Sequence, residues 1–367
     1  MPGLYPLRFK EILRNYDFGG RWIAEEFDKQ GLPEEHRLSE TWEVCDRPGE
    51  SSVVKNGALA GSSLHDLIET YGEELLGHAV TAESGSRFPL LIKLLDATNP
   101  LGEQVHQDNS LAKEQGLKDP GKTEAWYMLR TRPGATIHCG TREGIGRDEV
   151  LKALVDGTIR DVMEEQQARS GDAFLLHAGT MHYSHGGVLF YEIMQNSDVI
   201  MMLRSHEFLP GTEGRKKWAE KTIRAVRLAP GSECRVQPVI VALGMNRISY
   251  IFACRFFALE RLDLVSPHDI ACAGERFYVL TQIEGNSSVE GGTGSENLGP
   301  GQSCLLPASL GNVAVAPNGP CSLLKAYVPD LVRDIIEPLR RAQIQDRDII
   351  ALGGERGCNP LIGLIRK

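Results

Sequence analysis

The chain contains 367 residues, of which 41% are hydrophobic and 24% are charged, and these ordinary proportions exclude wholesale disorder. This length is typical of about two to three domains, with enough chain to bury a large core. The net charge is −9 and basic residues do not form long runs, so we expect no nucleic-acid partner.

The N-terminal segment, one long uncharged stretch and the cysteines indicate a cellular compartment. The first twenty residues lack the apolar segment of a signal peptide. A long uncharged stretch, 173–191, contains three histidines and a Gly-Gly pair, which disfavours a membrane helix. Eight cysteines are scattered without a CxxC pair. This pattern predicts reduced thiols in a cytoplasmic protein without a membrane partner.

The first predicted elements alternate between strand and helix. Residues 39–44 are expected to form a short strand, and 65–77 have the apolar spacing of a helix that ends at Gly77. The apolar run 88–97 is expected to be a buried strand, although such a run alone does not distinguish a strand from a helix. Residues 109–121 are expected to form a helix followed by a turn.

The middle of the chain is expected to return to strands. Residues 122–140 fit two strands joined by a Pro-Gly turn. Two short helical pieces, 147–157 and 158–167, are predicted next. Residues 171–204 contain apolar runs broken by glycine turns, which indicates further strands.

The last third is expected to repeat this organisation. Residues 207–226 form a charged, loop-like region, and a second strand-rich block starts near Gln237. The stretch 285–303, rich in Gly, Ser and Asn, is expected to be a turn region. Residues 329–343 have the period of an amphipathic helix, whereas the tail 350–367 has little period.

Two segments of similar pattern suggest two copies of one barrel. Residues 171–182 (GDAFLLHAGTMH) and 301–312 (GQSCLLPASLGN) both begin with glycine and lead through an apolar run into a tight turn. The echo is weak, but it connects the two strand-rich halves.

Four polar residues form a candidate metal site. Gln104 and His106 are two residues apart on a predicted strand, so their side chains point to the same face. Glu124 opens the next strand, and His182 follows a turn further on. Two imidazoles, a carboxylate and an amide oxygen suit zinc and tolerate manganese, iron or cobalt. Spacing alone leaves open the alternative that these histidines are ordinary core or surface residues.

Three ordered motifs resemble a known family. Residues 171–182 resemble the second cupin motif, and the segments 88–109, 121–129 and 177–182 together resemble the type I phosphomannose isomerase family of zinc cupins. The resemblance runs from roughly residue 17 to 207 and is weaker beyond.

The resemblance implies a mainly β fold of two tandem double-stranded β-helix (cupin, jelly-roll) barrels with a few inserted helices. It implies a catalytic cupin domain over 1–226 with helical insertions. The remaining part, 227–367, is expected to be a metal-free cupin-like domain with a C-terminal helix and tail. It further implies one divalent metal ion, expected to be Zn²⁺, held by the four residues of the candidate site, which are Gln104, His106, Glu124 and His182.

The activity implied by the family is aldose–ketose isomerisation, most simply of mannose 6-phosphate and fructose 6-phosphate through an enediol proton transfer. Lys122, two residues before Glu124, matches a family lysine expected to act in catalysis and substrate binding. Glu192 fits an inward-facing catalytic glutamate, and Lys93 is a candidate substrate-binding residue on a buried strand. Arg204 is the candidate for the catalytic arginine.

The chain departs from the family pattern around the metal frame. Gly102 replaces a serine associated with the phosphate end of the substrate, and Gln107 and His177 replace prolines. The usual arginine position is Met202, so Arg204 is displaced by two residues. A change of sugar and simple drift both explain such a pattern.

The departures keep two alternatives open. The protein could isomerise a different or non-phosphorylated sugar, or it could be a catalytically silent sugar-binding cupin. In each case the expected partner is a small sugar or sugar phosphate, and the chain is expected to be a monomer or homodimer. The additional histidines His138, His177 and His185 are expected to be hydrogen-bonded structural residues.

Overall fold

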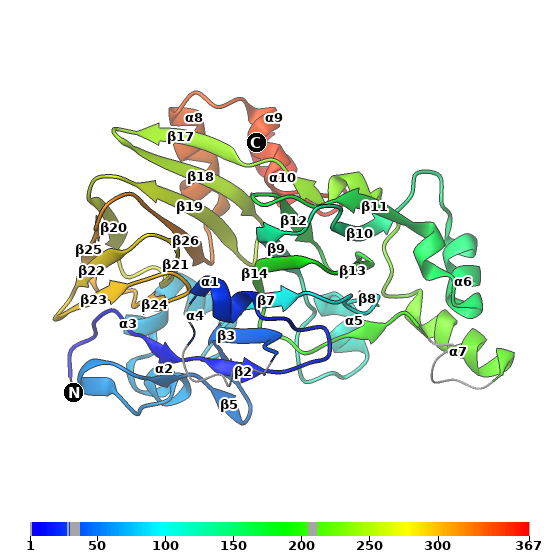
Figure 1. Cartoon of the computed structure of the whole chain (residues 1–367), viewed down its shortest axis with the longest axis horizontal. Coiled ribbons are helices and arrows are strands. Elements are labelled where there is room, and N and C mark those ends of the chain that lie inside the picture. Colours follow the sequence, from blue (N-terminus) through cyan, green and yellow to red (C-terminus); the bar gives the residue numbers. More distant parts are fainter. Residues whose placement is uncertain (1, 28, 30–36, 205–210, 367) are drawn as a thin grey trace.

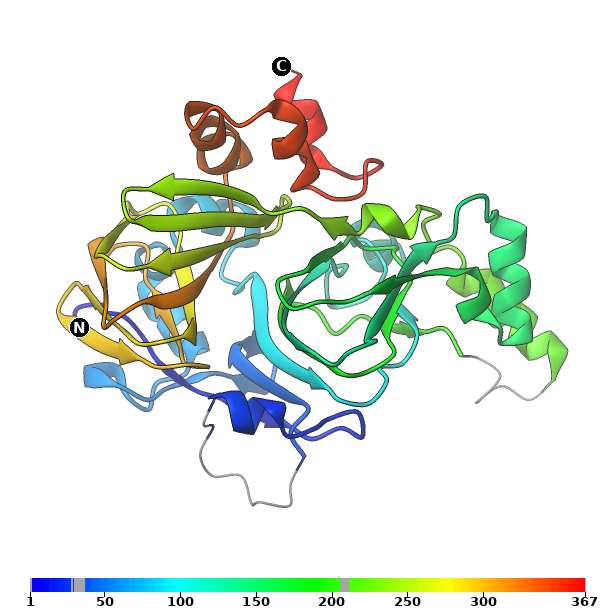
Figure 2. The same ribbon diagram turned by 45° about the horizontal axis from the view of Figure 1, so that its top comes forward.

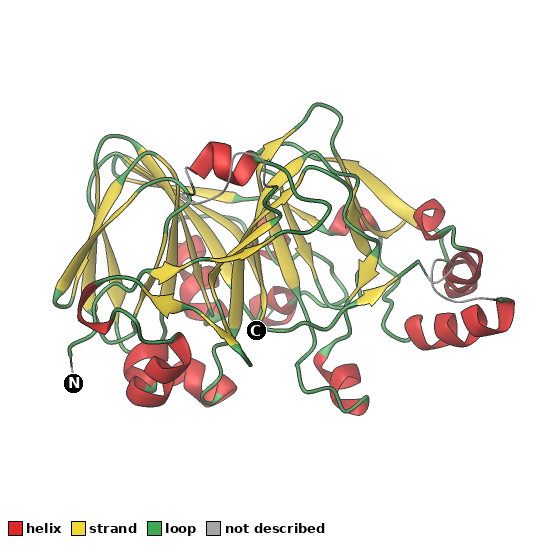
Figure 3. Cartoon of the chain, turned by 60° about the horizontal axis from the view of Figure 1, so that its bottom comes forward, coloured by secondary structure: helices red, strands yellow, loops and turns green. Residues whose placement is uncertain are grey.

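The structure, a computed structural model, describes residues 2–27, 29, 37–204 and 211–366. Within these residues, strands form two antiparallel barrels that lie side by side (Figures 1 and 2). Helices surround the strands at the periphery of the molecule (Figure 3). The expected mainly β fold with two barrels and inserted helices is therefore confirmed.

The first barrel consists of a seven-stranded and a five-stranded sheet. The seven-stranded sheet contains, in spatial order, β16 (Arg235–Val236), β12 (Ala173–Leu176), β9 (Glu124–Thr131), β14 (Val188–Gln195), β7 (Leu90–Ala97), β3 (Glu40–Val44) and β2 (Ile12–Arg14). The five-stranded sheet contains β11 (Met163–Gln167), β10 (Thr136–Thr141), β13 (His182–Ser184), β8 (Gln104–Val105) and β15 (Met201–Met202).

The second barrel consists of a six-stranded and a four-stranded sheet. The six-stranded sheet contains β17 (Val239–Leu243), β18 (Asn246–Ala253), β19 (Ala258–Leu264), β26 (Cys321–Tyr327), β21 (Tyr278–Glu284) and β24 (Ser303–Leu306). The four-stranded sheet contains β20 (His268–Cys272), β25 (Gly311–Pro317), β22 (Ser287–Gly291) and β23 (Gly294–Leu298).

The helices fall into three groups around the barrels (Figure 2). One group belongs to the N-terminal part and contains α1 (Trp22–Phe27), α2 (Leu64–Tyr71), α3 (Glu73–Leu76) and α4 (His78–Ser84). A second flanks the first barrel and contains α5 (Asn109–Glu114), α6 (Arg147–Asp156) and α7 (Thr212–Thr222). The C-terminal group contains η5 (Leu331–Ile336), α8 (Glu337–Arg341), α9 (Asp346–Ala351) and α10 (Pro360–Ile365). No helix in the described ranges has the length and apolar character required to cross a bilayer.

The two barrels share a continuous apolar core. The largest buried cluster joins Leu175 and Tyr191 of the first barrel to Leu259 and Leu280 of the second, together with apolar residues of α2 to α4. Because each barrel covers apolar surface of the other, burial of this shared surface favours a fixed contact between them.

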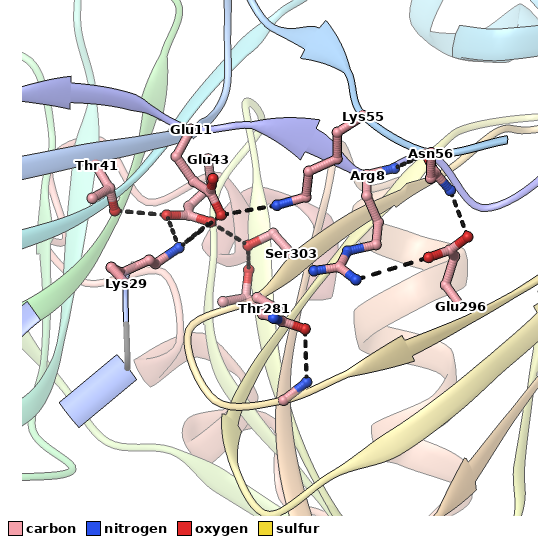
Figure 4. A network of polar contacts seen from close by, with 12 residues as sticks. Arg8, Glu11, Lys29, Thr41, Glu43, Lys55, Asn56, Thr281, Glu296 and Ser303 are labelled. Carbon is pink, nitrogen blue, oxygen red and sulfur yellow. Dashed lines mark hydrogen bonds and ion pairs between the residues drawn. The ribbon is translucent and has the colours of Figure 1, made fainter. Parts of the chain in front are cut away.

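A buried polar network reinforces the contact between the barrels (Figure 4). The carboxylate of Glu43, on β3, accepts hydrogen bonds from Thr41 at 2.6 Å and from Ser303 of the second barrel at 3.0 Å. Lys29 also donates to Glu43 at 3.0 Å, and Ser303 contacts Thr281 at 2.9 Å. The network therefore satisfies a buried carboxylate with donors from both barrels.

Several predicted elements are confirmed. The expected strands at 39–44 and 88–97 correspond to β3 and β7. The helix expected over 65–77 is present as α2 and α3, with Gly72 between them at a φ of 46°. The helices expected at 109–121, 147–157 and 329–343 correspond to α5, to α6 and to the consecutive segments η5 and α8.

Three predictions of local structure are wrong in whole or in part. The helix expected over 158–167 is present only as the short 3₁₀-helix η2 (Ile159–Val162), and the second half is wrong because Met163–Gln167 form β11, which pairs with β10. Residues 207–226 were expected to be a loop, and α7 forms within them because Ala219 and Ile223 pack against apolar residues of α6. The expected turn region 285–303 is a hairpin of β22 and β23, in which Ser287 pairs with Leu298. Residues 205–210 lie outside the described part of the chain.

Candidate metal centre and active site

Three predicted metal ligands converge inside the first barrel. His106 directly follows β8, Glu124 begins β9 and His182 begins β13. The Nε2 atom of His106 lies 3.2 Å from Oε2 of Glu124, and Nε2 of His182 lies 3.0 Å from Oε1 of the same carboxylate. All three side chains are buried, and their ligand atoms lie within 4.8 Å of one another. Strands from both sheets of the barrel thus bring these groups to one point.

The nitrogen and oxygen atoms at the centre of this cluster lack hydrogen-bond partners within the described part of the chain and are suited to bind a cation. The Nδ1 atoms of His106 and His182 lie 2.8 Å from the carbonyl oxygen of Val199 and 2.9 Å from that of Thr180. A protonated Nδ1 donates to the carbonyl in each pair, which leaves the Nε2 lone pair directed at the cluster. Both Nε2 atoms and both Glu124 oxygens are buried without a hydrogen-bond partner among the described residues. Such a set is expected of metal ligands.

Charge around the cluster favours the ligand-competent protonation states. Burial opposes ionisation of Glu124, but Lys122, His106 and His182 outweigh it and hold its pKa well below the usual range. Burial and the nearby Lys122 ammonium lower the pKa of His106 to about 3. The carboxylate is therefore ionised and the His106 imidazole neutral at neutral pH, which are the forms that bind a metal.

The fourth predicted ligand, Gln104, lies at the same place in the sheet. Gln104 is the direct partner of His182 in the pairing of β8 with β13. It is partly buried and lines a cavity of about 460 Å³. This position agrees with a role beside the three buried ligands, and coordination by the Gln104 amide oxygen stays a prediction.

The cavity lies along one face of the strands that carry the cluster. Lys122, just before β9, and Trp126, within β9, line the cavity, and so does Glu192 of β14. Its remaining lining residues are Tyr16, Asp17, Phe18, Glu40, Trp42, Lys93, Leu95, Leu101, Gly102, Gln104, Met194, Asp198, Ile200 and Met202. A cavity of this size accepts a small polar ligand such as a sugar.

A buried lysine connects two carboxylates in this cavity. The Nζ atom of Lys93 lies 3.1 Å from Oε2 of Glu192 and 3.2 Å from Oε2 of Glu40. The indole N–H of Trp126 donates to Oε1 of Glu192 at 2.9 Å, and that of Trp42 donates to Glu40 at 2.7 Å. Both carboxylates are thus oriented by a cation and by an indole.

The protonation equilibria of Lys93 and Glu192 are both perturbed. Burial would lower the pKa of Lys93, but Glu40 and Glu192 outweigh it and raise that pKa above its ordinary value. Burial raises the pKa of Glu192, and Lys93 opposes this shift only in part while Glu124 adds to it. A buried carboxyl with a raised pKa beside a polar cavity is a candidate for proton transfer.

Glu40, Trp42 and Trp126 are site residues that sequence reasoning missed. The sequence of residues 39–44 indicates only a buried strand, although Glu40 and Trp42 are two residues apart and therefore share a face. A charged residue within a strand that is otherwise buried is the available signal. The same signal identifies its partner Lys93.

Lys122 and Arg204 occupy different environments. The Nζ atom of Lys122 lies 3.2 Å from Oε2 of Glu124, so the two side chains meet as expected, although Lys122 precedes β9 and does not share a strand with Glu124. Arg204 lies just beyond β15, and its Nε atom is 3.6 Å from Oε2 of Glu103. Its side chain is 37% exposed, and it is not among the described residues that line the cavity. Met202 lines the cavity instead.

Two departures from the family pattern contact each other. A Cβ atom added to Gly102 would lie 2.3 Å from Cε of Met202. The methionine therefore occupies the space that a serine side chain at position 102 would need. Both residues line the cavity.

The additional histidines have different surroundings. The Nε2 atom of His177 lies 2.9 Å from the carbonyl oxygen of Gly353, as expected of a structural histidine. His138 stacks on the ring of Tyr183 with a centroid distance of 4.3 Å. His185 is exposed, and its ring centroid lies 6.5 Å from that of His138. None of the three lines the cavity beside the metal centre within the described residues.

Comparisons with known families identify both halves of the chain. The family "Phosphomannose isomerase type I, catalytic domain" matches residues 7–126, and "Mannose-6-phosphate isomerase, cupin domain" matches residues 246–328. The mannose-6-phosphate isomerase ManA of Bacillus subtilis is 27% identical over 83% of this chain and 94% of its own length. The mannose-6-phosphate isomerase of Escherichia coli is 36% identical, over 84% of this chain and 96% of its own length.

Solved structures share the fold. The crystal structure of mannose 6-phosphate isomerase from Bacillus subtilis is 24% identical, covers 88% of this chain and 99% of its own, and gives a TM-score of 0.75. A point mutant of phosphomannose isomerase from Salmonella typhimurium is 19% identical, with a TM-score of 0.72 over 88% of this chain and 99% of its own. Both superpositions extend over most of this chain.

Proposed function

This chain belongs to the type I phosphomannose isomerase family, and from that premise we propose that it interconverts mannose 6-phosphate and fructose 6-phosphate. It is an aldose–ketose isomerase. The observation that carries the proposal is the juxtaposition of two groups in the first barrel. The buried ligand cluster of His106, Glu124 and His182 adjoins a cavity that holds the ion-paired carboxylate of Glu192.

The cluster accounts for a divalent metal ion, and we propose that the ion is Zn²⁺. Two imidazole nitrogens, a carboxylate and the Gln104 amide leave positions for substrate oxygens, and zinc accepts this mixture of ligands. When bound, the ion would polarise the carbonyl and hydroxyl oxygens of the sugar and stabilise the charge of the enediolate.

Glu192 is the proposed proton carrier. Isomerisation requires one group to remove a proton from the carbon beside the carbonyl and to return it to the neighbouring carbon. The carboxylate of Glu192 lines the cavity, and Trp126 and Lys93 fix both of its oxygens. Its raised pKa makes the carboxylate a stronger base than an ordinary glutamate.

Cationic groups are proposed to hold the substrate. Lys122 is directed to the Glu124 side of the cavity, where its ammonium can stabilise a negative oxygen. Lys93 is proposed to bind substrate through the cavity that it lines and to keep Glu192 in position. Arg204 remains the proposed catalytic arginine, although it lies beside Glu103 and is not among the described residues that line the cavity.

The division of labour and the compartment are also proposals. We propose that residues 1–226 carry the reaction, since the ligand cluster lies there, and that 227–367 form a second, metal-free cupin-like domain, although β16 of this part pairs with β12 of the first barrel. All eight cysteines lie in described residues and are free thiols, which supports a cytoplasmic location. The expected partner is a sugar phosphate, with no nucleic acid or membrane, and the expected assembly is a monomer or homodimer.

One observation favours a second candidate substrate. The resemblance associates a serine at position 102 with the phosphate end of the sugar, and here Gly102 faces the side chain of Met202 instead. An apolar wall there suits a different or non-phosphorylated sugar better than a phosphate. A catalytically silent sugar-binding cupin is the alternative that a lack of turnover would indicate.

A substrate panel tests the proposal. The metal-loaded protein is incubated with mannose 6-phosphate, fructose 6-phosphate, mannose and fructose, and the products are separated by chromatography. Interconversion of the two phosphates is the expected result. Conversion of the free sugars alone would replace the proposed substrate, and no conversion of any of them would contradict an isomerase.

A further inference from the structure

A second polar depression lies between the two barrels, apart from the cavity that contains Glu192. Two adjoining cavities of about 530 Å³ and about 320 Å³ form it, and they share Asn109, Gln195, Arg255 and Phe256. We call this the inter-barrel groove. Its walls come from the ends of β9 and β14 in the first barrel, from the turn between β18 and β19 in the second and from the C-terminal tail.

Arginines dominate the charge of the inter-barrel groove. Arg87, Arg227 and Arg255 line it together with two carboxylates, Glu83 and Asp108. The Asp108 carboxylate accepts a hydrogen bond from the backbone at the start of α5, so it is partly engaged. The lining residues therefore include three cationic and two anionic side chains, in a chain whose net charge is −9, and this local excess of arginine favours an anionic ligand.

Arg255 is an exposed arginine of this groove. Unlike Arg87 and Arg227, it forms no ion pair with a carboxylate of the described residues. Its guanidinium carbon lies 4.4 Å from the ring centroid of Phe256, a stacking contact that restricts its rotation. An arginine held in this way keeps its N–H groups available for an incoming anion.

The other two arginines are anchored but not saturated. Arg227 forms an ion pair with Glu355 at 3.4 Å, and Arg87 forms one with Asp119 at 3.5 Å. Arg227 also donates to the carbonyl oxygen of Ala178. A guanidinium has five N–H donors, so donors remain on each of these two arginines. These ion pairs hold Arg87 and Arg227 in place and offset their charges, so Arg255 is the lining arginine that has no ion-pair partner among the described residues.

Neutral donors and a buried histidine complete the lining. Asn109 and Gln195 offer amides, and their side chains are hydrogen-bonded to each other at 3.2 Å. His177, which lines the smaller cavity, is buried near Arg227 and Arg255, and burial together with these two cations lowers its pKa to about 4. A neutral imidazole and amides suit the hydroxyl groups of a small organic molecule.

We propose that the inter-barrel groove is a second ligand site of this protein, which binds a small organic phosphate monoester. A phosphate monoester carries close to two negative charges at neutral pH and matches the forked N–H groups of arginine. The volumes of the two cavities suit a ligand of a few to a dozen heavy atoms rather than a polymer. The proposal concerns a site separate from the one at which isomerisation is proposed.

The wall of this site is hydrogen-bonded to the segments that carry the metal ligands. The backbone N–H of Thr123, next to Glu124, donates to the Gln195 side chain at 2.9 Å. The Thr123 hydroxyl accepts from the N–H of Ala178 at 3.2 Å, in the turn that leads to His182. A ligand that orders Gln195 would therefore also restrain the backbone that holds Glu124.

Calorimetric titration of the metal-loaded protein tests the proposal. The titrants are inorganic phosphate, glycerol 3-phosphate and acetate at fixed ionic strength. The variants are Arg255→Ala, Arg255→Lys and Lys122→Ala, with Arg347→Ala as a control on an exposed helix, where the side chain is 78% exposed. Lys122→Ala removes a cation from the other cavity, so it separates phosphate bound there from phosphate bound in the groove.

We expect saturable binding of both phosphates that persists in Lys122→Ala and Arg347→Ala. In Arg255→Ala it should weaken roughly tenfold or more, since a charge-assisted hydrogen bond is lost, and Arg255→Lys should recover only part of it. Three outcomes would overturn the proposal: no saturable binding, binding that only Lys122→Ala removes, or acetate binding as tight as that of phosphate. None of these outcomes depends on turnover, so the isomerase proposal is tested separately.

Discussion

Lys93 and Glu192 are direct cross-strand partners in the pairing of β7 with β14, and their charged groups meet at 3.1 Å in the wall of the cavity. The register of two neighbouring strands therefore sets the position of the proposed base. Because both side chains are buried, with 9% and 6% of their side chains exposed, water competes little with this contact.

The first prediction concerns Glu192 as the base. Glu192→Gln keeps the size of the side chain but removes its basicity, so kcat should fall by about 10²–10⁴. Since burial raises the pKa of Glu192, its carboxylate becomes protonated at a higher pH than that of an ordinary glutamate. In the unmodified enzyme, kcat should therefore decline as pH falls through this raised pKa, and the residual activity of Glu192→Gln should lack that decline. Glu290→Gln, at an exposed position, is the control. An unchanged kcat in Glu192→Gln would exclude the proposed role.

The second prediction concerns the metal. His106→Ala and His182→Ala each remove one of the converging ligands, so elemental analysis should show most of the bound divalent ion lost. Glu124→Gln should weaken metal affinity because it removes the formal negative charge of the cluster. His185→Ala, an exposed histidine in the same barrel, should bind metal normally. Full metal content in both His106→Ala and His182→Ala would contradict the assignment of these ligands. If the unmodified protein contains much more of another metal than of zinc, that metal would replace Zn²⁺ in the proposal.

The third prediction concerns Arg204 and its displacement. If Arg204 stabilises charge in the transition state, Arg204→Ala should lower kcat by about 10²–10³ and change KM little. Moving the arginine from position 204 to position 202, in the cavity wall, tests directly whether its displacement along the chain matters. The variant Met202→Arg, Arg204→Ala should recover part of kcat, since Met202 lines the cavity. Unchanged steady-state kinetics in Arg204→Ala would show that this side chain lies outside the site.

The fourth prediction concerns the contact between the barrels. Glu43→Ala leaves the buried ammonium of Lys29 and the hydroxyl of Ser303 without their shared acceptor. The free energy of unfolding, measured in urea, should fall by about 3 kcal/mol. This value is at the lower end of the range for a broken buried ion pair, because Glu11 still contacts Lys29 at 3.2 Å. Ser303→Ala should cost about 1 kcal/mol, and Glu290→Ala less than about 0.5 kcal/mol. Equal stability of Glu43→Ala and Glu290→Ala would contradict a stabilising role.

The sequence could predict the metal cluster because its signal is local. Alternation along a strand places Gln104 and His106 on one face, and the motif spacing adds Glu124 and His182. Three of these four residues converge in the structure. The order of the motifs also identified the family, which supplied the barrel that no single segment specifies.

Contacts that depend on register could not be predicted. Nothing in the sequence around Lys93 specifies that Glu192 and Glu40 lie on either side of it. Glu192 is its direct partner on β14, whereas Glu40 lies two residues from its partner Trp42 on β3, so the register of both strand pairs sets these contacts. The helix α7 was missed for a related reason, since its apolar residues are few and form a face only against α6. The environment of Arg204 beside Glu103 likewise follows from the path of the chain after β15.

The measurement that tests the central claim most directly is isotope exchange in heavy water. The metal-loaded protein is incubated with mannose 6-phosphate in deuterium oxide, and the sugar is analysed by proton NMR. A metal-dependent isomerase that moves a proton between C1 and C2 predicts fructose 6-phosphate together with deuterium at C1 or C2, both lost in His182→Ala. Binding of mannose 6-phosphate with neither product nor deuterium incorporation would contradict an isomerase and indicate a sugar-binding cupin.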